Sequence, residues 1–237
     1  MNKICFLLLC IVSLCLSSCM KSGNVQHYYD VPAVVKMEPT IGQPVLITTK
    51  EVFVAPELRE YFQYAILQEG EAVLAAFSLD PDQEPIQGYR TVLEFDCFQV
   101  GITAVAEEKD VDKTAFLPIQ KIEPFALIVH EKILVMYVAF NHNTTFRKYA
   151  YTITYEPDET AEIPMLSIRA RAVGDEYPTA SESLWPYVFE MYDYIQTLPK
   201  DAQNQVRINL RYKTGVDNDG NEVWTTYANN PLIIPLK

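Results

Sequence analysis

The sequence is poor in cysteine and glycine, and each shortage excludes a class of protein. Beyond its first nineteen residues the chain has one cysteine, Cys97, which has no partner for an intrachain disulfide. The fold must therefore be stabilised by buried apolar area, and 237 residues are enough to provide it. Glycine occurs only eight times, and no Gly-x-Ser-x-Gly elbow, Walker loop or dinucleotide fingerprint is present. The glycine-rich phosphate-binding loops are thus missing.

Histidine is also scarce, and the three copies, His27, His130 and His142, are isolated from one another. No two of them have the spacing of a metal-ligand pair, and no cluster of cysteine and histidine occurs. Paired carboxylates for glycoside hydrolysis depend on their spacing in three dimensions, and nothing in the sequence selects a pair. We therefore expect no metal, no cofactor and no catalytic residue, with a hydrolase as the third choice among the functions considered.

Positive charge is the third shortage. The chain has 31 acidic and 19 Lys and Arg residues, a formal net charge of −12, which becomes −13 when residues 1–18 and their single charge, Lys3, are removed. Binding to nucleic acid requires a basic surface, so we expect no nucleic-acid partner. The acidity is typical of a well-solvated surface.

The most informative segment that is present is the N-terminus, MNKICFLLLCIVSLCLSSC. After a short positive start, the apolar run from Ile4 to Leu16 is shorter than the roughly 20 residues of a transmembrane helix. Small residues then lead to Cys19, an ending that resembles a bacterial lipobox. We expect residues 1–18 to be a lipoprotein signal peptide, Cys19 to carry the lipid, and residues 19–27 to form a tether. The acyl chain is then the contact with the membrane.

Most of the remaining chain has the two-residue alternation of strands. Residues 205–213 are the clearest example, because Val206, Ile208, Leu210 and Tyr212 alternate with Arg207, Asn209, Arg211 and Lys213. This pattern predicts one buried face and one wet, cationic face. Residues 165–172 alternate in the same way and place Arg169 and Arg171 on the wet face, while residues 133–140 are apolar on both faces and suit the centre of a sandwich.

Helix is predicted in one place only. Pro56 stands at a permitted first-turn position, and Leu58 and Phe62 follow at helical spacing. A charged stretch at residues 107–113 then separates two strand-rich halves. We predict an all-β chain: an OB-like β-barrel with this short helix over residues 28–110, followed by an antiparallel β-sandwich over residues 111–237.

Several segments follow the lipobox in a characteristic order. They are Ala33-Val34-Val35-Lys36, residues 69–80, residues 89–100, the paired strands 133–140 and 149–155, and the closing strands 188–198 and 206–212. In this order the chain resembles the NigD-like lipoproteins, Gram-negative exported proteins with an OB-like barrel and a β-sandwich. The resemblance implies a lipid-anchored protein of the outer membrane, on either of its faces. It also implies bacteriocin immunity, by association with a gene cluster alone.

Two local motifs have alternative interpretations. The alternation of residues 93–100 places Leu93, Phe95, Cys97 and Gln99 on one face, so Cys97 is expected to be a small buried hydrophobe and not a nucleophile. Residues 217–222 resemble half of a calcium loop, but the twelfth position is Ala228, which offers no carboxylate. A hairpin turn at Asp219-Gly220 is the preferred interpretation.

An aromatic stretch supplies the candidate ligand site. Trp185, Tyr187 and Tyr192 would stack on sugar rings if their faces were exposed, whereas the same residues would fill a sandwich core if they were buried. Our leading hypothesis is a non-enzymatic, membrane-anchored binding or protection protein whose partner is an unidentified envelope or extracellular protein. The alternative is a glycan-binding lipoprotein that uses this aromatic patch.

Overall fold

The computed structural model describes residues 25–108, 116–142, 146–157, 161–176 and 185–236. The predicted signal peptide, Cys19 and the tether up to residue 24 lie outside the described residues. The first strand already begins at Gln26, and His27 pairs with Ser78 across the sheet. The last two residues assigned to the tether are therefore part of a strand.

The N-terminal half is a closed barrel with the strand order β1-β2-β3-β5-β4. Its strands are β1 (Gln26–Glu38), β2 (Gln43–Thr48), β3 (Val52–Val54), β4 (Ala72–Leu79) and β5 (Arg90–Val100). The alternation of β4 places Val73, Ala75 and Phe77 in the barrel core. The predicted helix is present as α2 (Leu58–Gln63), and Leu58 buries its side chain in the same core.

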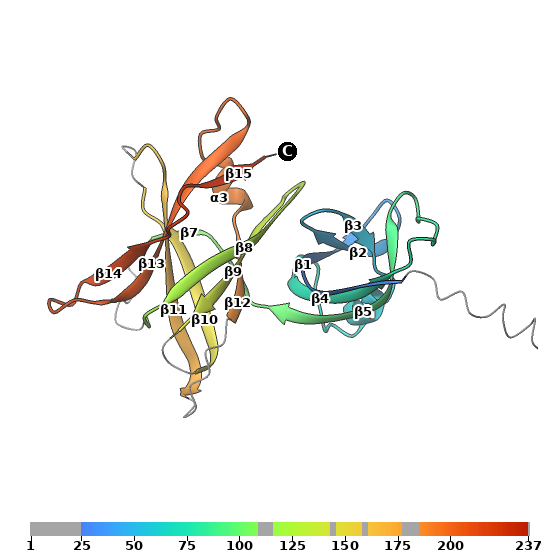
Figure 1. Cartoon of the computed structure of the whole chain (residues 1–237), viewed down its shortest axis with the longest axis horizontal. Coiled ribbons are helices and arrows are strands. Elements are labelled where there is room, and N and C mark those ends of the chain that lie inside the picture. Colours follow the sequence, from blue (N-terminus) through green and yellow to red (C-terminus); the bar gives the residue numbers. More distant parts are fainter. Residues whose placement is uncertain (1–24, 109–115, 143–145, 158–160, 177–184, 237) are drawn as a thin grey trace, which may run out of the picture.

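Two sheets make up the C-terminal half, and Figure 1 shows them beside the barrel. One sheet has the order β6-β12-β9-β8; the other runs β14-β13-β11-β10-β7, with β15 paired to β13. The strands are β6 (Ile102–Ala104), β7 (Ala106–Glu107), β8 (Lys121–His130), β9 (Ile133–Asn141), β10 (Phe146–Tyr155), β11 (Met165–Glu176), β12 (Trp185–Glu190), β13 (Gln205–Val216), β14 (Glu222–Thr226) and β15 (Leu232–Pro235). Most pairs are antiparallel, but β11–β13, β10–β7 and β12–β6 are parallel. The all-β prediction is confirmed.

One predicted strand is partly wrong. Residues 188–198 were expected to be a single strand, but β12 ends at Glu190 and the helix α3 (Tyr192–Gln196) follows. Met191 and Ile195 are four residues apart, and both are buried in the sandwich core. The amide of Ile195 donates to the carbonyl of Met191 over 2.9 Å. Helical spacing of the buried positions therefore overrides the aromatic strand preference after Met191.

The predicted wet, cationic face is also partly wrong. The inward alternation of β13 is as expected, since Val206, Ile208 and Leu210 are buried. On the opposite face, however, Lys213 is 0% exposed and Arg169 is 1% exposed. Glu108, which follows β7, and Glu222, the first residue of β14, place their carboxylates on this face and pair with the two cations. Sequence alternation identifies two faces of a strand, but it does not show that both are covered.

Barrel and sandwich pack directly on each other. Val34, Val45 and Val54 of the barrel share a buried cluster with Val135 and Tyr137 of β9. The Tyr137 hydroxyl lies 2.5 Å from the carbonyl oxygen of Ala33 in β1 and 3.1 Å from that of Val73 in β4. This joint combines apolar packing with a buried hydrogen bond, so it holds β1 and β4 of the barrel against β9 of the sandwich.

Candidate functional site

A cavity of about 450 Å³ lies where β5 leaves the barrel and enters the sandwich through β6. We call it the junction cavity; the residues that line it include Phe98, Tyr149, Tyr151, Tyr187, Glu71 and Gln99. The barrel supplies Phe98 and Gln99 from β5, and the sandwich supplies tyrosines from β10 and β12. Small-ligand sites typically have this character, an aromatic lining with a few polar groups and a volume of about 300–1,000 Å³.

Gly101 makes the cavity wall possible. It connects β5 to β6, and its carbonyl accepts a 2.9 Å hydrogen bond from the amide of Val188. The ring of Tyr187 lies against the Gly101 backbone so closely that an added Cβ would be 2.4 Å from Tyr187 Cε2. Any other residue at position 101 would therefore displace the Tyr187 ring from the cavity wall.

Buried aromatic contacts hold the sandwich side of the cavity in place. Tyr151 stacks on Phe140 with ring centroids 3.9 Å apart, and Tyr149 stacks on His142, also at 3.9 Å. His142 Nδ1 is 3.2 Å from the carbonyl oxygen of Pro118, and Nε2 is 2.8 Å from the Tyr151 hydroxyl. A carbonyl only accepts, so Nδ1 carries the proton; in neutral His142, Nε2 then accepts from the tyrosine.

The electrostatics of the cavity are mild. Burial raises the pKa of Tyr151 above its ordinary value, and burial also raises the pKa of Tyr187, an effect that the nearby positive charge of Arg171 reduces. Both phenols are therefore protonated at neutral pH. Glu71 contributes a carboxylate that accepts a 2.8 Å hydrogen bond from the backbone amide of Gln68. The lining thus offers hydroxyl, amide and carboxylate groups without a lysine or arginine among its described residues.

Protonation of His142 is expected to destabilise the fold. Burial lowers the pKa of His142, while its bond to Pro118 partly offsets this. The unfolded chain then binds more protons than the folded one, so stability is full above pH 6.5, the ordinary histidine value, and falls as the pH drops below it. We expect a loss of up to about 1.4 kcal/mol per pH unit. Urea unfolding of the wild type and His142→Gln, each above and below pH 6.5, tests this, since only the wild type should show the histidine contribution. An equal change of unfolding free energy with pH in the two proteins would contradict it.

A second cluster is formed by buried charges on the outer face of the larger sheet. The Arg169 guanidinium lies 2.7 Å from Glu108 Oε1 and 2.8 Å from Glu222 Oε2, and Lys213 Nζ is 3.6 Å from Glu222 Oε1. Trp224 lies between two guanidinium groups, with Arg169 at 4.6 Å and Arg211 at 4.5 Å from its ring centroid. Burial lowers the pKa of Arg169, but the hydrogen bonds to Glu222 and Glu108 outweigh it and raise that pKa. These groups are mutually paired and connect distant parts of the chain, so the cluster is structural.

The third group of polar residues brings together a histidine, a serine and a glutamate on the barrel. Ser78 Oγ lies 2.8 Å from His27 Nδ1 and donates to Glu94 Oε2 over 2.7 Å. A serine nucleophile would instead give its proton to the histidine. Ser78 is moreover only 3% exposed. This arrangement does not match an activated nucleophile.

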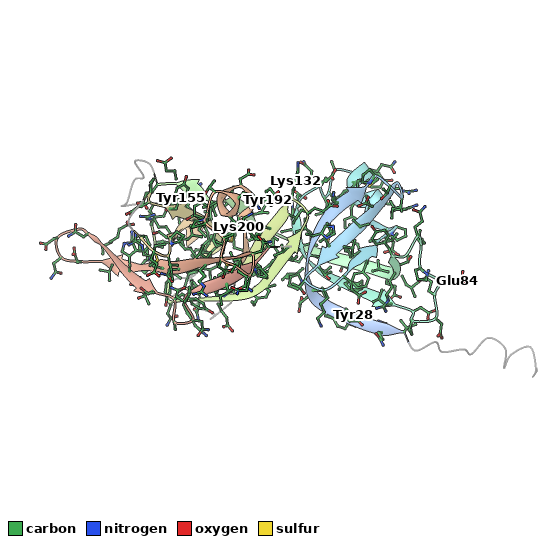
Figure 2. All side chains as sticks on the ribbon, turned by 90° about the horizontal axis from the view of Figure 1, so that it is seen from above. Tyr28, Glu84, Lys132, Tyr155, Tyr192 and Lys200 are labelled. Carbon is green, nitrogen blue, oxygen red and sulfur yellow. The ribbon has the colours of Figure 1, made fainter. Side chains whose placement is uncertain are left out.

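Of the two described side chains in the predicted aromatic platform, Tyr187 lines the junction cavity and Tyr192 does not. Tyr187 is half-buried there. Tyr192, labelled in Figure 2, opens α3 and is half-buried against the sandwich core, outside the lining. Trp185 begins β12 opposite Phe140, and its side chain is not among the described ones. The cavity residues on β5 and β10 were not predicted as a site, because their common location depends on the barrel–sandwich joint.

Cys97 is half-buried rather than fully buried. Burial raises the pKa of its thiol to about 11, and the charges of Asp96 and Glu71 act in the same direction. The predicted shared face of residues 93–99 is only partly correct: Phe95 is buried, whereas Leu93 is 39% exposed. The pairing with β4 shifts between Phe77 and Leu79, so Val92 replaces Leu93 on the inner side. The thiol is protonated at neutral pH and is a poor nucleophile.

The segment 217–222 is the turn of the hairpin between β13 and β14, as preferred from the sequence. Asp217 Oδ1 accepts hydrogen bonds from the amides of Asp219 and Asn221, and Gly220 has a φ of +85°. In the part of the chain that the structure describes, no group of three or more His, Cys, Asp and Glu side chains is placed to hold a metal ion. Among the same residues, no helix has the length and apolar character to cross a membrane.

No protein-family model matches the sequence, and no curated protein matches it. Solved structures share its fold. An uncharacterized protein from Parabacteroides merdae has a TM-score of 0.69 at 15% identity, over 87% of this chain and 98% of its own. A protein of unknown function from Bacteroides vulgatus has a TM-score of 0.51 at 14% identity, over 85% of this chain and 90% of its own. The likeness shows a common arrangement of barrel and sandwich.

Another of the solved structures is of a protein that carries the name of the family resembled by the sequence. A NigD-like immunity protein from Bacteroides caccae has a TM-score of 0.48 at 11% identity, over 90% of this chain and 98% of its own. A likeness of this size carries no argument about function. The similarity to the NigD-like family is therefore a resemblance in the order of sequence segments, and the residues of this chain's own site carry the functional proposal.

Proposed function

We propose that this chain is a non-enzymatic, lipid-anchored binding protein of the bacterial outer membrane, which holds its ligand in the junction cavity. The observation that carries the binding role is the cavity itself, because its walls come from two folded units locked together by Tyr137. A preformed site of this kind binds without first ordering its walls. Anchoring is supported by the signal-like segment before Cys19.

The absence of catalysis is part of the same proposal. The thiol of Cys97 is held protonated, and the hydroxyl of Ser78 donates to Glu94 instead of to a base. Neither group is therefore activated for attack. Binding, and not turnover, is the role that the described side chains support.

Replacing Cys19 with serine is expected to abolish lipidation. The thiol is the proposed acylation site, and a hydroxyl cannot replace it in the lipobox. Cells expressing the full chain would be grown with radioactive palmitate, and the purified protein would be examined for label. Cys15→Ser is the matched control, since this residue lies in the segment proposed to be removed, and it should keep the label. Equal labelling of Cys19→Ser and the wild type would contradict the anchor.

Protection against an incoming bacteriocin is a second candidate function, separate from ligand binding in the junction cavity. It is supported by the resemblance to NigD-like lipoproteins in the order of elements. The ligand would then be a protein, recognised at the membrane where the lipid holds the chain. Deletion of the gene should sensitise the host to culture supernatants of a competing strain, and restoring the chain should reverse this. Unchanged sensitivity would remove this second candidate.

A further inference from the structure

We propose that the junction cavity binds a neutral carbohydrate, with a sugar ring stacked between the exposed side of Phe98 and the face of Tyr187. This inference rests on the proposed binding function and names its ligand class. A pyranose ring has apolar C–H patches on its faces and hydroxyl groups around its edge. Its recognition therefore requires flat apolar side chains together with donors and acceptors at the margin.

The aromatic part of this requirement is met from both sides of the joint. Phe98 is 59% exposed, although the barrel's other phenylalanines on strands, Phe53, Phe77 and Phe95, are each at most 7% exposed. Tyr187, which lines the same cavity, is held on one side by the Gly101 backbone and on another by the Tyr151 ring at 4.8 Å. An exposed phenylalanine and a fixed tyrosine in one lining give a ligand two apolar surfaces without rearrangement of the core.

The polar part comes from Glu71 and Gln99. Glu71 has two carboxylate oxygens, of which Oε2 accepts a hydrogen bond from the backbone amide of Gln68. Gln99 is exposed at the cavity and offers both a carbonyl and an amide group. These two side chains accept from and donate to hydroxyl groups, as a polyhydroxylated ligand requires.

Charge selects a neutral ligand. A carboxylate in the lining and a formal net charge of −12 for the chain disfavour phosphorylated, sulfated or uronic sugars. For a cationic ligand, the positive charge of Arg171, which acts on the Tyr187 phenol, partly offsets the Glu71 carboxylate. The cavity volume of about 450 Å³ lies within the range of small-ligand sites.

The test is calorimetric titration of the full lipidated protein, in detergent, with four neutral oligosaccharides: maltohexaose, cellohexaose, xylohexaose and mannohexaose. We expect at least one to bind with a dissociation constant between about 1 μM and 1 mM. Phe98→Ala should weaken that binding at least about tenfold, because it removes one of the two faces. The matched control is Tyr64→Ala, which removes a 68% exposed aromatic side chain from outside the cavity and should leave the affinity unchanged.

Two results would overturn the inference: no heat with any of the four sugars, or equal binding by wild type and Phe98→Ala. Circular dichroism of each variant shows whether it is folded, and Gln99→Ala gives a second, exposed substitution at the same cavity. Lipidation of Cys19 is measured on the same preparations. If the preparations carry lipid but bind no sugar, the carbohydrate proposal is removed and the anchored binding protein is kept. If they bind sugar but Cys19 carries no lipid, the anchor is removed and the carbohydrate proposal is kept.

Discussion

Replacing Arg169 with methionine is expected to lower the free energy of unfolding by about 3–5 kcal/mol. Arg169 is 1% exposed, and its guanidinium binds Glu108 and Glu222, which are themselves 12% and 5% exposed in their side chains. The substitution leaves Glu108 without this guanidinium and leaves Glu222 with the longer Lys213 contact of 3.6 Å. A buried carboxylate that loses its counter-charge is strongly unfavourable. Urea unfolding of the purified protein at neutral pH measures the change.

A matched substitution separates this effect from the loss of any arginine. Arg207 lies on β13 with an exposed side chain, so Arg207→Met should change the free energy of unfolding by no more than about 0.5 kcal/mol. Adding Glu108→Gln to Arg169→Met should recover part of the loss, because Glu108 is the carboxylate that loses its counter-charge while Glu222 keeps Lys213. A loss below about 1 kcal/mol for Arg169→Met would show that the pairs do not form as described.

Replacing Tyr137 with alanine is expected to cost about 3–5 kcal/mol of unfolding free energy. The side chain is 0% exposed at the joint, and Phe125 packs edge-on against it at 5.9 Å. Alanine removes this ring from the cluster between barrel and sandwich and leaves a cavity there. It also removes the hydroxyl that lies beside the carbonyls of Ala33 and Val73.

The phenylalanine variant isolates the hydrogen bond. Tyr137→Phe keeps the ring and should cost about 1–3 kcal/mol, the penalty for leaving a buried carbonyl without its donor. Tyr29→Phe is the control, since the Tyr29 side chain is 73% exposed and its hydroxyl remains in water after folding. Thermal and urea unfolding measure all three variants. If Tyr137→Ala cost no more than the control, barrel and sandwich would not be held together through this residue.

Local pattern predicts much of this fold. The alternation of residues 205–213 gives the buried face of β13, and Asp219-Gly220 marks its hairpin turn with β14. The helical spacing after Pro56 identifies α2. These features depend on neighbours in sequence, so the residues themselves contain the signal.

The remainder depends on contacts between distant segments. Arg169 lies on the polar side of an alternating strand, and its burial depends on Glu108, 61 residues earlier, and Glu222, 53 residues later. The bulge that turns Leu93 outward is a property of the pairing with β4. Neither effect has a local sequence signal.

The candidate site shows the same division. The sequence identifies Tyr187 as an aromatic side chain able to bind a sugar. Of the two residues expected beside it, Tyr192 does not line the cavity, and the side chain of Trp185 is outside the described ones. The residues that line the cavity with Tyr187 include Phe98 and Tyr151, which come from strands that meet only because the barrel packs on β9. A small clue is available in Gly101, one of only eight glycines, at the point where the chain leaves the barrel.

The most direct test of a ligand site at the joint is a crystal structure of the protein grown with the neutral oligosaccharide that binds best in the titrations. We predict density for a sugar ring against Phe98 and Tyr187, with hydroxyl groups within hydrogen-bond distance of Glu71 and Gln99. Sugar bound elsewhere on the chain, with the junction cavity holding only water, would contradict the account.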